Sequence, residues 1–268
     1  MKIAAIQMVS STGVQANLDV ARLLLAQAAG QGAEMAVLPE YFCVMGMKDT
    51  DKLKVREPAG SGLIQDFLSR TARELGMWIV GGTLPTATGD TGRARNTSLA
   101  YAPSGACVAR YDKIHLFRFS QGQEQHDETR VLDPGKQPVS FALASQDGHR
   151  YTVGLSVCYD LCFPELYRAL RADLLLVPSA FTYVTGQAHW ELLLRARAIE
   201  NLAYVVAAAQ GGVHENGRRT WGHSMVVGPW GEILAEQAEG PGVVMGELQA
   251  SRLQEVRQRL PALSHRVL

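Results

Sequence analysis

A strand pattern gives way to a helix pattern within Tyr151-Thr-Val-Gly-Leu-Ser-Val-Cys158-Tyr-Asp-Leu-Cys162-Phe-Pro164-Glu-Leu-Tyr-Arg-Ala-Leu170. The first half is apolar and β-branched, as in a buried strand, and the second half opens with Pro164 and continues with apolar residues at helical spacing. Cys158 lies where the two halves meet. Because the positive end of a helix lowers the pKa of a nearby thiol, this position favours a reactive thiolate. A buried structural cysteine is the alternative.

The remainder of the chain alternates in the same way. Apolar runs at 2–8 and 35–40 flank a helical pattern at 14–30, so the chain opens as a strand, a helix and a strand. The segment from Lys113 to Pro138 is long, polar and irregular, which is typical of a functional or disordered segment. The same criteria predict further helices at about 61–76, 189–202 and 251–260, and strands at 77–82, 97–102, 107–111, 172–178, 204–209, 223–227 and 243–248.

Several of these strands follow one another without a helix between them. This succession argues against a barrel with one helix per strand, and it favours an α/β fold in which two sheets pack together with helices outside. No linker, low-complexity tract or block of charge divides the sequence. We therefore expect residues 1–268 to form one domain.

The composition indicates an ordinary globular protein with a small-molecule partner. Hydrophobic residues make up 47% of the chain and charged residues 19%, and 26 Lys and Arg balance 26 Asp and Glu. A formal charge of zero provides no electrostatic basis for binding nucleic acid or anionic lipid. No apolar run is long enough to span a membrane, and the chain opens directly into a strand pattern, so we expect a cytoplasmic protein.

The four cysteines do not form a disulfide framework. They are too few and too scattered for one, and Cys158 and Cys162 match neither a redox pair nor half of a common zinc ribbon. A reducing compartment fits this usage.

Three reactive side chains each follow an apolar run. Glu40 follows Met35-Ala-Val-Leu-Pro, Lys113 follows the strand predicted at 107–111, and Cys158 follows Val153-Gly-Leu-Ser-Val. Residues at the carboxyl ends of strands in α/β proteins converge on one crevice. There a carboxylate can accept the thiol proton, an ammonium can stabilise an oxyanion, and a thiolate can attack a carbonyl or nitrile carbon. Surface ion pairs and a core cysteine are the structural alternatives.

A Cys–His–Asp arrangement is a second catalytic hypothesis. None of the candidate histidines lies in a local signature that would select it as the partner of Cys158. These histidines are His115, His126, His189 and His223. A metal site that combines Cys158, Cys162 and a distant histidine is a weaker hypothesis, because the spacing matches no common ligand pattern.

Three segments with Glu, Lys and Cys in that order form a recognisable set. They are Leu38-Pro-Glu40-Tyr-Phe42, Tyr111-Asp-Lys113-Ile-His-Leu-Phe117, and Cys158-Tyr-Asp-Leu161 followed by Phe163-Pro-Glu165. They resemble the signature segments of the nitrilase superfamily, the carbon–nitrogen hydrolases. The resemblance extends over essentially the whole chain. It implies a four-layer αββα sandwich, usually paired as a homodimer, with no metal or organic cofactor.

The segments at 178–200 and 207–231 are similar to the Nit branch of that superfamily, particularly its deaminated-glutathione amidases. The likeness implies hydrolysis of the side-chain amide of an α-keto acid, with deaminated glutathione giving 2-oxoglutarate and cysteinylglycine. The ω-amidases, which act on 2-oxoglutaramate, share most of these residues and are the alternative. Other small amides, nitriles or N-carbamoyl compounds are substrates elsewhere in the superfamily.

The resemblance also implies roles for individual residues. Glu40 would be the general base, Cys158 the nucleophile, and Lys113 with the backbone N–H of Tyr159 the oxyanion donors. Glu128 would position the substrate and support the lysine, unless it is a solvated loop carboxylate. The segment that lines the substrate pocket contains Phe181 and Thr185.

One departure from the family pattern concerns Cys162, since many members have Arg four residues after the nucleophile. The replacement leaves the details of substrate binding open, and an oxidative pair with Cys158 is a further hypothesis. A binding protein that lost its chemistry is disfavoured by the intact Glu40, Lys113 and Cys158. Acyl transfer to an amine shares the thioester step with hydrolysis, so the sequence does not separate these two reactions.

Overall fold

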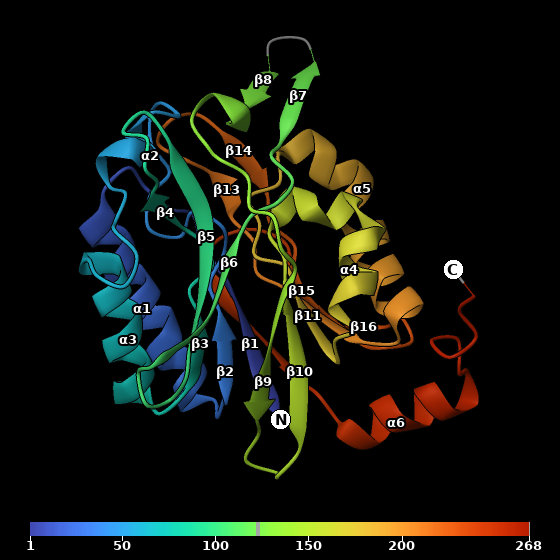
Figure 1. Cartoon of the computed structure of the whole chain (residues 1–268). Coiled ribbons are helices and arrows are strands. Elements are labelled where there is room, and N and C mark those ends of the chain that lie inside the picture. The colour runs from blue at the N-terminus through green and yellow to red at the C-terminus, as the bar shows by residue number, and fades with distance from the viewer. Residues whose placement is uncertain (122–123, 268) are drawn as a thin grey trace.

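Two β-sheets packed face to face form the centre of the computed structural model, which describes residues 1–121 and 124–267 (Figure 1). The first sheet has seven strands in the order β17 (Gly242–Glu247), β1 (Lys2–Gln7), β2 (Met35–Val37), β3 (Trp78–Val80), β5 (Ala94–Tyr101) and β4 (Leu84–Ala87), with β6 (Cys107–Asp112) paired to β5. The second has six in the order β16 (Ile233–Gln237), β15 (Ser224–Val227), β12 (Tyr204–Ala207), β11 (Leu174–Leu176), β10 (Arg150–Leu155) and β9 (Val139–Ala144).

Helices cover the outer faces of the two sheets. In Figure 1, α1 (Val14–Gly30) and α3 (Leu63–Leu75) lie outside the first sheet, and α4 (Pro164–Leu170) and α5 (Tyr183–Asn201) lie outside the second. The four-layer αββα sandwich that the resemblance implied is therefore confirmed. The smaller elements are α2 (Asp51–Lys54), α6 (Ala250–Arg259), the 3₁₀ turns η1 (Glu128–Arg130) and η2 (Cys158–Cys162), and the hairpins β7 (Arg118–Gln121) with β8 (Glu124–Asp127) and β13 (Gly211–Val213) with β14 (Arg219–Trp221).

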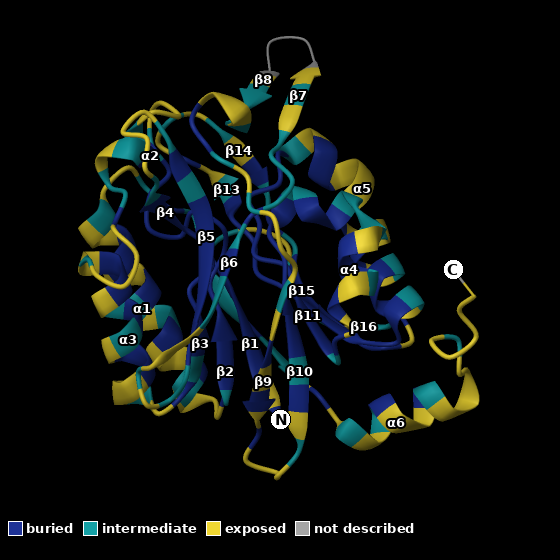
Figure 2. Ribbon diagram, in the orientation of Figure 1, coloured by how far each residue is buried: buried dark blue, intermediate teal, exposed yellow. Residues whose placement is uncertain are grey.

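Side-chain alternation along β1 shows how the layers are packed. Ile3 and Ala5 face the core between the sheets, whereas Ala4 and Ile6 face the core under α1 and α3. Successive residues of a strand point to opposite faces, so a strand with helices on one side and a sheet on the other must be apolar throughout. Figure 2 shows the resulting band of buried strands between partly exposed helices.

Some boundaries of helices and strands that were predicted from the sequence are wrong. The helix predicted at 189–202 begins at Tyr183, because the Thr182 side chain caps it by accepting a hydrogen bond from the Thr185 N–H. The segment from Lys113 to Pro138 is not irregular throughout, since it contains the β7–β8 hairpin and η1, although residues 122–123 of that segment lie outside the described part. The short strands β4, β9 and β16 were not predicted.

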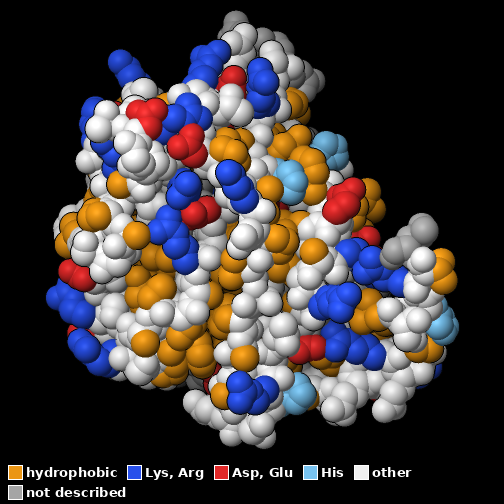
Figure 3. Space-filling view, in the orientation of Figure 1, with side chains coloured by type: hydrophobic (Ala, Val, Ile, Leu, Met, Phe, Trp, Pro, Cys, Tyr) orange, Lys and Arg blue, Asp and Glu red, His pale blue; other side chains and the backbone are white. Residues whose placement is uncertain are grey.

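The surface in Figure 3 shows acidic, basic and apolar side chains scattered over one face, with no continuous stripe of a single charge. Within the described residues, no helix has the length and apolar character needed to cross a membrane.

Gly82 allows the chain to pass closely behind the segment that bears Glu40. Its φ is +47°, and a Cβ at this position would lie 2.0 Å from the Pro39 carbonyl oxygen. We expect Gly82→Ala to lower the free energy of unfolding by about 2 kcal/mol or more, because both the backbone conformation and the contact become unfavourable.

Chemical denaturation measures this effect, with Gly89→Ala as the matched control, because a Cβ at Gly89 would meet nothing within 4 Å. Equal stability of the two variants would contradict the expectation.

Candidate active site

Glu40 lies in the turn that follows β2, and the structure fixes both of its carboxylate oxygens. Oε1 accepts hydrogen bonds from Lys113 Nζ at 2.9 Å and Asn96 Nδ2 at 2.8 Å, and Oε2 accepts one from the Ala180 N–H at 2.9 Å. Gln210 Nε2 donates to the Glu40 carbonyl oxygen at 3.1 Å and holds the backbone. Glu40 is only 1% exposed, so its orientation is set by the protein.

Lys113 follows β6 directly and joins two carboxylates. Its Nζ lies 2.9 Å from Glu40 Oε1 and 2.8 Å from Glu128 Oε2. Burial alone would lower the pKa of the ammonium, but the charges of Glu128 and Glu40 outweigh it and hold the pKa well above its ordinary value. Lys113 therefore stays protonated and can donate to an oxygen that gains negative charge.

Glu128 begins η1, and its carboxylate contacts Lys113 directly. Oε2 also accepts a hydrogen bond from the Phe117 N–H at 2.8 Å, and Oε1 accepts one from the Tyr41 hydroxyl at 2.7 Å. Burial would raise the pKa of Glu128, yet Lys113 and Lys52 lower it to about 2. Glu128 is thus an ionised part of the lysine's surroundings, and not the solvated loop carboxylate that was the alternative.

Cys158 begins η2 with a φ of +52°, which is unusual for a residue with a side chain. Its N–H donates to the Pro178 carbonyl oxygen at 2.9 Å, which links the turn to the end of β11. The residue is 7% exposed. The conformation turns the chain sharply after β10 and is maintained by the packing around it.

The expectation of a thiol pKa lowered by a helix is wrong for Cys158. The α-helix that follows begins only at Pro164, so Cys158 does not lie at its first turn. Burial and the negative charge of Glu40 raise the pKa of the thiol well above its ordinary value, although Lys113 offsets part of this effect. The Cys158 side chain is therefore a protonated thiol in this arrangement.

Asp160 links the segment around Lys113 to the turn that begins at Cys158. Its Oδ2 accepts hydrogen bonds from the Val157 N–H at 2.8 Å and the Tyr111 hydroxyl at 2.7 Å. Its Oδ1 accepts one from the His115 N–H at 3.0 Å and lies 2.7 Å from His115 Nδ1. Because Asp160 is fully buried, these bonds rigidly couple the two ends of the site.

One cavity brings together all seven residues that the sequence nominated. Its lining includes Glu40, Lys113, Glu128, Cys158, Tyr159, Phe181 and Thr185. Within the described chain, Cys162 does not line this cavity, and neither does any of the four histidines considered as partners of the thiol. Cys158 and Cys162 are both free thiols. The geometry therefore favours the Glu–Lys–Cys arrangement over the Cys–His–Asp and metal-site hypotheses.

Several residues of the site were missed by the sequence reasoning. Asn96 holds Glu40, Tyr41 holds Glu128, and Arg218 lines the cavity beside Ala180. A signal existed for Asn96, since Asn is uncommon inside strands and this one is 1% exposed within β5. Arg218 lies far away in sequence and shows no local pattern, so only the folded chain reveals it.

Known proteins resemble this chain over nearly its whole length. The family model described as carbon-nitrogen hydrolase matches residues 2–258. A protein of Synechocystis sp. named deaminated glutathione amidase is 42% identical, covering 98% of this chain and 97% of its own. Its namesake in Homo sapiens is 39% identical, covering 98% and 81%. An omega-amidase of Danio rerio is 34% identical, covering 99% and 94%.

Solved structures show the same relationship. The structure of Nit3 from Saccharomyces cerevisiae, a member of the nitrilase superfamily, has a TM-score of 0.87 at 30% identity and covers 100% of this chain and 97% of its own. A glutamate-to-glutamine variant of an amidase from Nesterenkonia sp., with acrylamide added at its active-site cysteine, has a TM-score of 0.77 at 30% identity and covers 97% and 98%. Since the family match extends from β1 into α6, this chain belongs to the carbon–nitrogen hydrolases.

Proposed function

We propose that this enzyme hydrolyses the side-chain amide of deaminated glutathione and releases 2-oxoglutarate and cysteinylglycine. The chemistry rests on Lys113, whose ammonium lies 2.9 Å from Glu40 and 2.8 Å from Glu128 in the wall of the cavity that contains Cys158. The choice of substrate is supported by the relatives from Synechocystis sp. and Homo sapiens, which are 42% and 39% identical and named for this activity.

Acylation begins when Cys158 Sγ attacks the amide carbon and its proton passes to Glu40, the general base. The carbonyl electrons move to oxygen, and the resulting oxyanion accepts hydrogen bonds from Lys113 Nζ and the Tyr159 N–H. Glu40 then donates its proton to the departing nitrogen, and the C–N bond breaks. The products of this half-reaction are a thioester on Cys158 and the free amine of cysteinylglycine.

Deacylation uses the same groups in reverse. Glu40 accepts a proton from water, and the hydroxyl oxygen attacks the thioester carbon while Lys113 and the Tyr159 N–H again stabilise the oxyanion. The C–S bond breaks, 2-oxoglutarate departs, and the Glu40 proton returns to the thiolate. Glu128 holds Lys113 in place during both halves, and it positions the substrate from the same wall.

The acyl group lies between two further walls of the cavity. Phe181 forms an apolar wall that packs on Trp190, with ring centroids 4.9 Å apart. Thr185 forms a polar wall, and its hydroxyl lies 2.8 Å from that of Thr182. Both residues line the cavity at the N-terminal end of α5.

Hydrolysis of 2-oxoglutaramate is the second candidate function. The omega-amidase of Danio rerio, at 34% identity, supports it. Both substrates would form the same acyl-enzyme and differ only in the leaving group, which is ammonia in one case and cysteinylglycine in the other. Transfer of the acyl group to an amine remains an alternative to hydrolysis for the second step.

The proposal also includes the compartment of the enzyme and its domain organisation. Cys43, Cys107, Cys158 and Cys162 are free thiols, as is usual in the reducing cytoplasm, where we place the enzyme. We treat residues 1–268 as a single catalytic domain, a choice supported by the pairing of β17 with β1.

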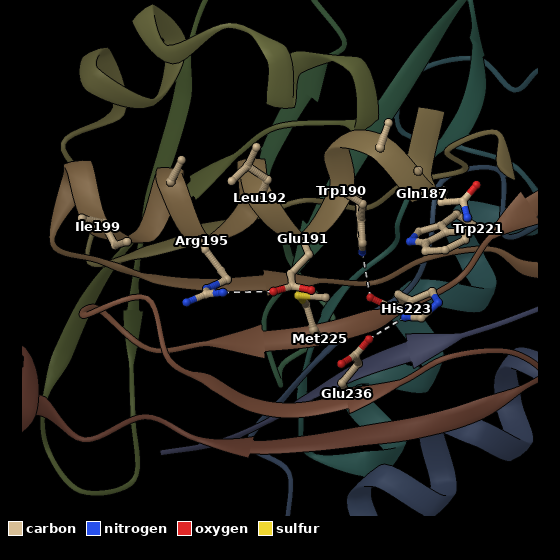
Figure 4. A pocket seen from close by; sticks show the side chains of 13 residues that line it. Gln187, Trp190, Glu191, Leu192, Arg195, Ile199, Trp221, His223, Met225 and Glu236 are labelled. Atoms are coloured by element: carbon tan, nitrogen blue, oxygen red, sulfur yellow. Dashed lines mark hydrogen bonds and ion pairs between the residues drawn. The ribbon is translucent and has the colours of Figure 1, made fainter. Parts of the chain in front are cut away.

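A homodimer that packs through α5 completes the proposal. Leu192 is 70% exposed and points away from the sheet (Figure 4), and Ile199 is 47% exposed on the same helix. Arg195 Nε donates to the Gly231 carbonyl oxygen at 2.9 Å, which places Trp230, itself 53% exposed, next to this helix. Exposed apolar groups gathered in this way are typical of an interface between subunits.

Substituting Leu192 tests the dimer. We expect the wild type to elute as a dimer and Leu192→Glu to shift toward the monomer, because a buried carboxylate without a partner is unfavourable. Leu23→Glu is the matched control, since Leu23 is 71% exposed on α1 outside the other sheet. Size-exclusion chromatography with light scattering measures the mass. A monomeric wild type, or equal behaviour of the two variants, would contradict the proposal.

Kinetics of substituted enzymes test the catalytic roles. We expect Cys158→Ala to abolish turnover and Lys113→Ala to lower kcat by about a hundredfold or more, because an oxyanion donor is lost. Both proteins should remain folded by circular dichroism. Turnover by Cys158→Ala would exclude the thioester mechanism.

The same assay decides between the candidate substrates, with Cys158→Ala as the blank. A higher kcat/KM for deaminated glutathione than for 2-oxoglutaramate is the expected result, and the reverse order would favour the omega-amidase function.

The pH dependence of alkylation tests the raised thiol pKa. We expect the rate at Cys158 to keep rising above pH 9.0, the ordinary pKa of a thiol. Glu40→Gln should lower the apparent pKa because a negative charge is removed, and Lys113→Met should raise it because a positive charge is removed. Iodoacetamide labelling with peptide mass spectrometry follows each cysteine, and Cys107, exposed on β6, is the internal control. A plateau below pH 9.0 in the wild type would show that the assigned direction is wrong.

A further inference from the structure

Arg218 contributes a cation to the wall of the catalytic cavity that the mechanism does not use. Its Nη2 donates to the Ala180 carbonyl oxygen at 2.9 Å, whereas its Nε is buried without a hydrogen-bond partner. In the part of the chain that the structure describes, its guanidinium pairs with no carboxylate. A buried donor without a partner is unfavourable, so this geometry suits a ligand that supplies an acceptor.

The backbone around Arg218 is held firmly. The Arg218 N–H donates to Asn216 Oδ1 at 2.9 Å, and Asn216 Nδ2 donates to the Gly46 carbonyl oxygen at 2.7 Å. His214, which is 3% exposed, places its ring nitrogens 2.9 Å from the Ser10 carbonyl oxygen and 2.9 Å from Thr220 Oγ1. The β13–β14 turn therefore presents Arg218 from a fixed position, which lowers the entropic cost of binding.

Arg218 balances the charge of the cavity lining. The other charged residues in the lining are Glu40, Glu128 and Lys113, so without Arg218 the wall would have one net negative charge. A substrate that bears a carboxylate would be repelled by such a wall. Arg218 is the cation in this lining that is not already shared between two carboxylates, and a guanidinium matches a carboxylate in geometry.

We infer that Arg218 binds a carboxylate of the substrate and makes the enzyme selective for anionic amides. This inference rests on the proposed function and adds a residue that determines specificity. The bond to Ala180 supports it, because the same residue donates its N–H to Glu40 Oε2 at 2.9 Å and so fixes Arg218 relative to the general base.

Two carboxylates of deaminated glutathione could provide this partner, one in the acyl part and one in the leaving group. Arg218 and Thr182 also line a second cleft of about 530 Å³, whose walls include Lys48, Lys52 and Arg219. A leaving group as long as cysteinylglycine could extend into this basic cleft. The acyl carboxylate would instead meet Arg218 inside the catalytic cavity.

Substituting Arg218 tests the inference. We expect Arg218→Met to lower kcat/KM by about 30-fold to 100-fold for an anionic amide, mainly through KM, and by less than about twofold for pentanamide, a neutral amide of the same acyl length. Arg218→Lys should restore part of the loss. Arg259→Met is the matched control, because Arg259 pairs with Glu255 on α6 and lines neither the catalytic cavity nor the second cleft.

The substrates separate the two sources of the carboxylate. Equal losses with deaminated glutathione and 2-oxoglutaramate would assign Arg218 to the acyl carboxylate, and a loss confined to deaminated glutathione would assign it to the leaving group. Losses that also extend to pentanamide would indicate a structural role and overturn the inference, as would unchanged kinetics with every anionic amide.

A binding assay separates failure of the inference from failure of the proposed function. Protection of Cys158 from iodoacetamide is measured with 2-oxoglutarate and with cysteinylglycine in the wild type and in Arg218→Met. If the wild type hydrolyses neither keto-acid amide, the proposed function fails. The role of Arg218 is then decided by the protection assay alone. The inference is supported if 2-oxoglutarate or cysteinylglycine protects Cys158 in the wild type and this protection is lost in Arg218→Met. It is overturned if neither compound protects the wild type, or if protection is the same in both proteins.

Discussion

The site depends on a buried ammonium that must be neutralised. Lys113 is 1% exposed, and a charge in such surroundings is tolerated only with close partners. Its partners come from separate parts of the chain, Glu40 after β2 and Glu128 at η1. Pairing the lysine therefore brings these segments together, and the same contacts place the Lys113 ammonium beside the Glu40 carboxylate.

The surrounding hydrogen bonds extend this constraint to Cys158. Asp160 receives hydrogen bonds from Tyr111, two residues before Lys113, and from Val157, the residue before Cys158. The strained turn at Cys158 and the lysine segment are thus fixed by one buried carboxylate. In this arrangement Lys113 remains protonated and Cys158 remains a thiol, so under the proposed mechanism proton transfer to Glu40 would be part of the attack and not a preceding equilibrium.

Much of the fold was predictable because apolar periodicity and capping are local. The strands before Glu40, Lys113 and Cys158 were recognised from β-branched runs, and the motifs at their ends identified the residues that now line one cavity. The polar β7–β8 and β13–β14 hairpins were not recognised, since neither has a buried apolar face. The thiol pKa was predicted in the wrong direction, because Glu40 approaches Cys158 only in the folded chain.

The two sheets contribute different parts of the cavity lining. Glu40 and Lys113 follow strands of the first sheet, whereas Cys158 and Phe181 follow strands of the second. A chain whose sheets had formed without docking would have all of these side chains but would not bring them into one cavity. The assembly of the cavity consequently depends on the apolar contacts between the sheets, including those far from its lining. In this architecture, residues such as Ile3 and Leu174 support the cavity from the core between the sheets, although they do not line it.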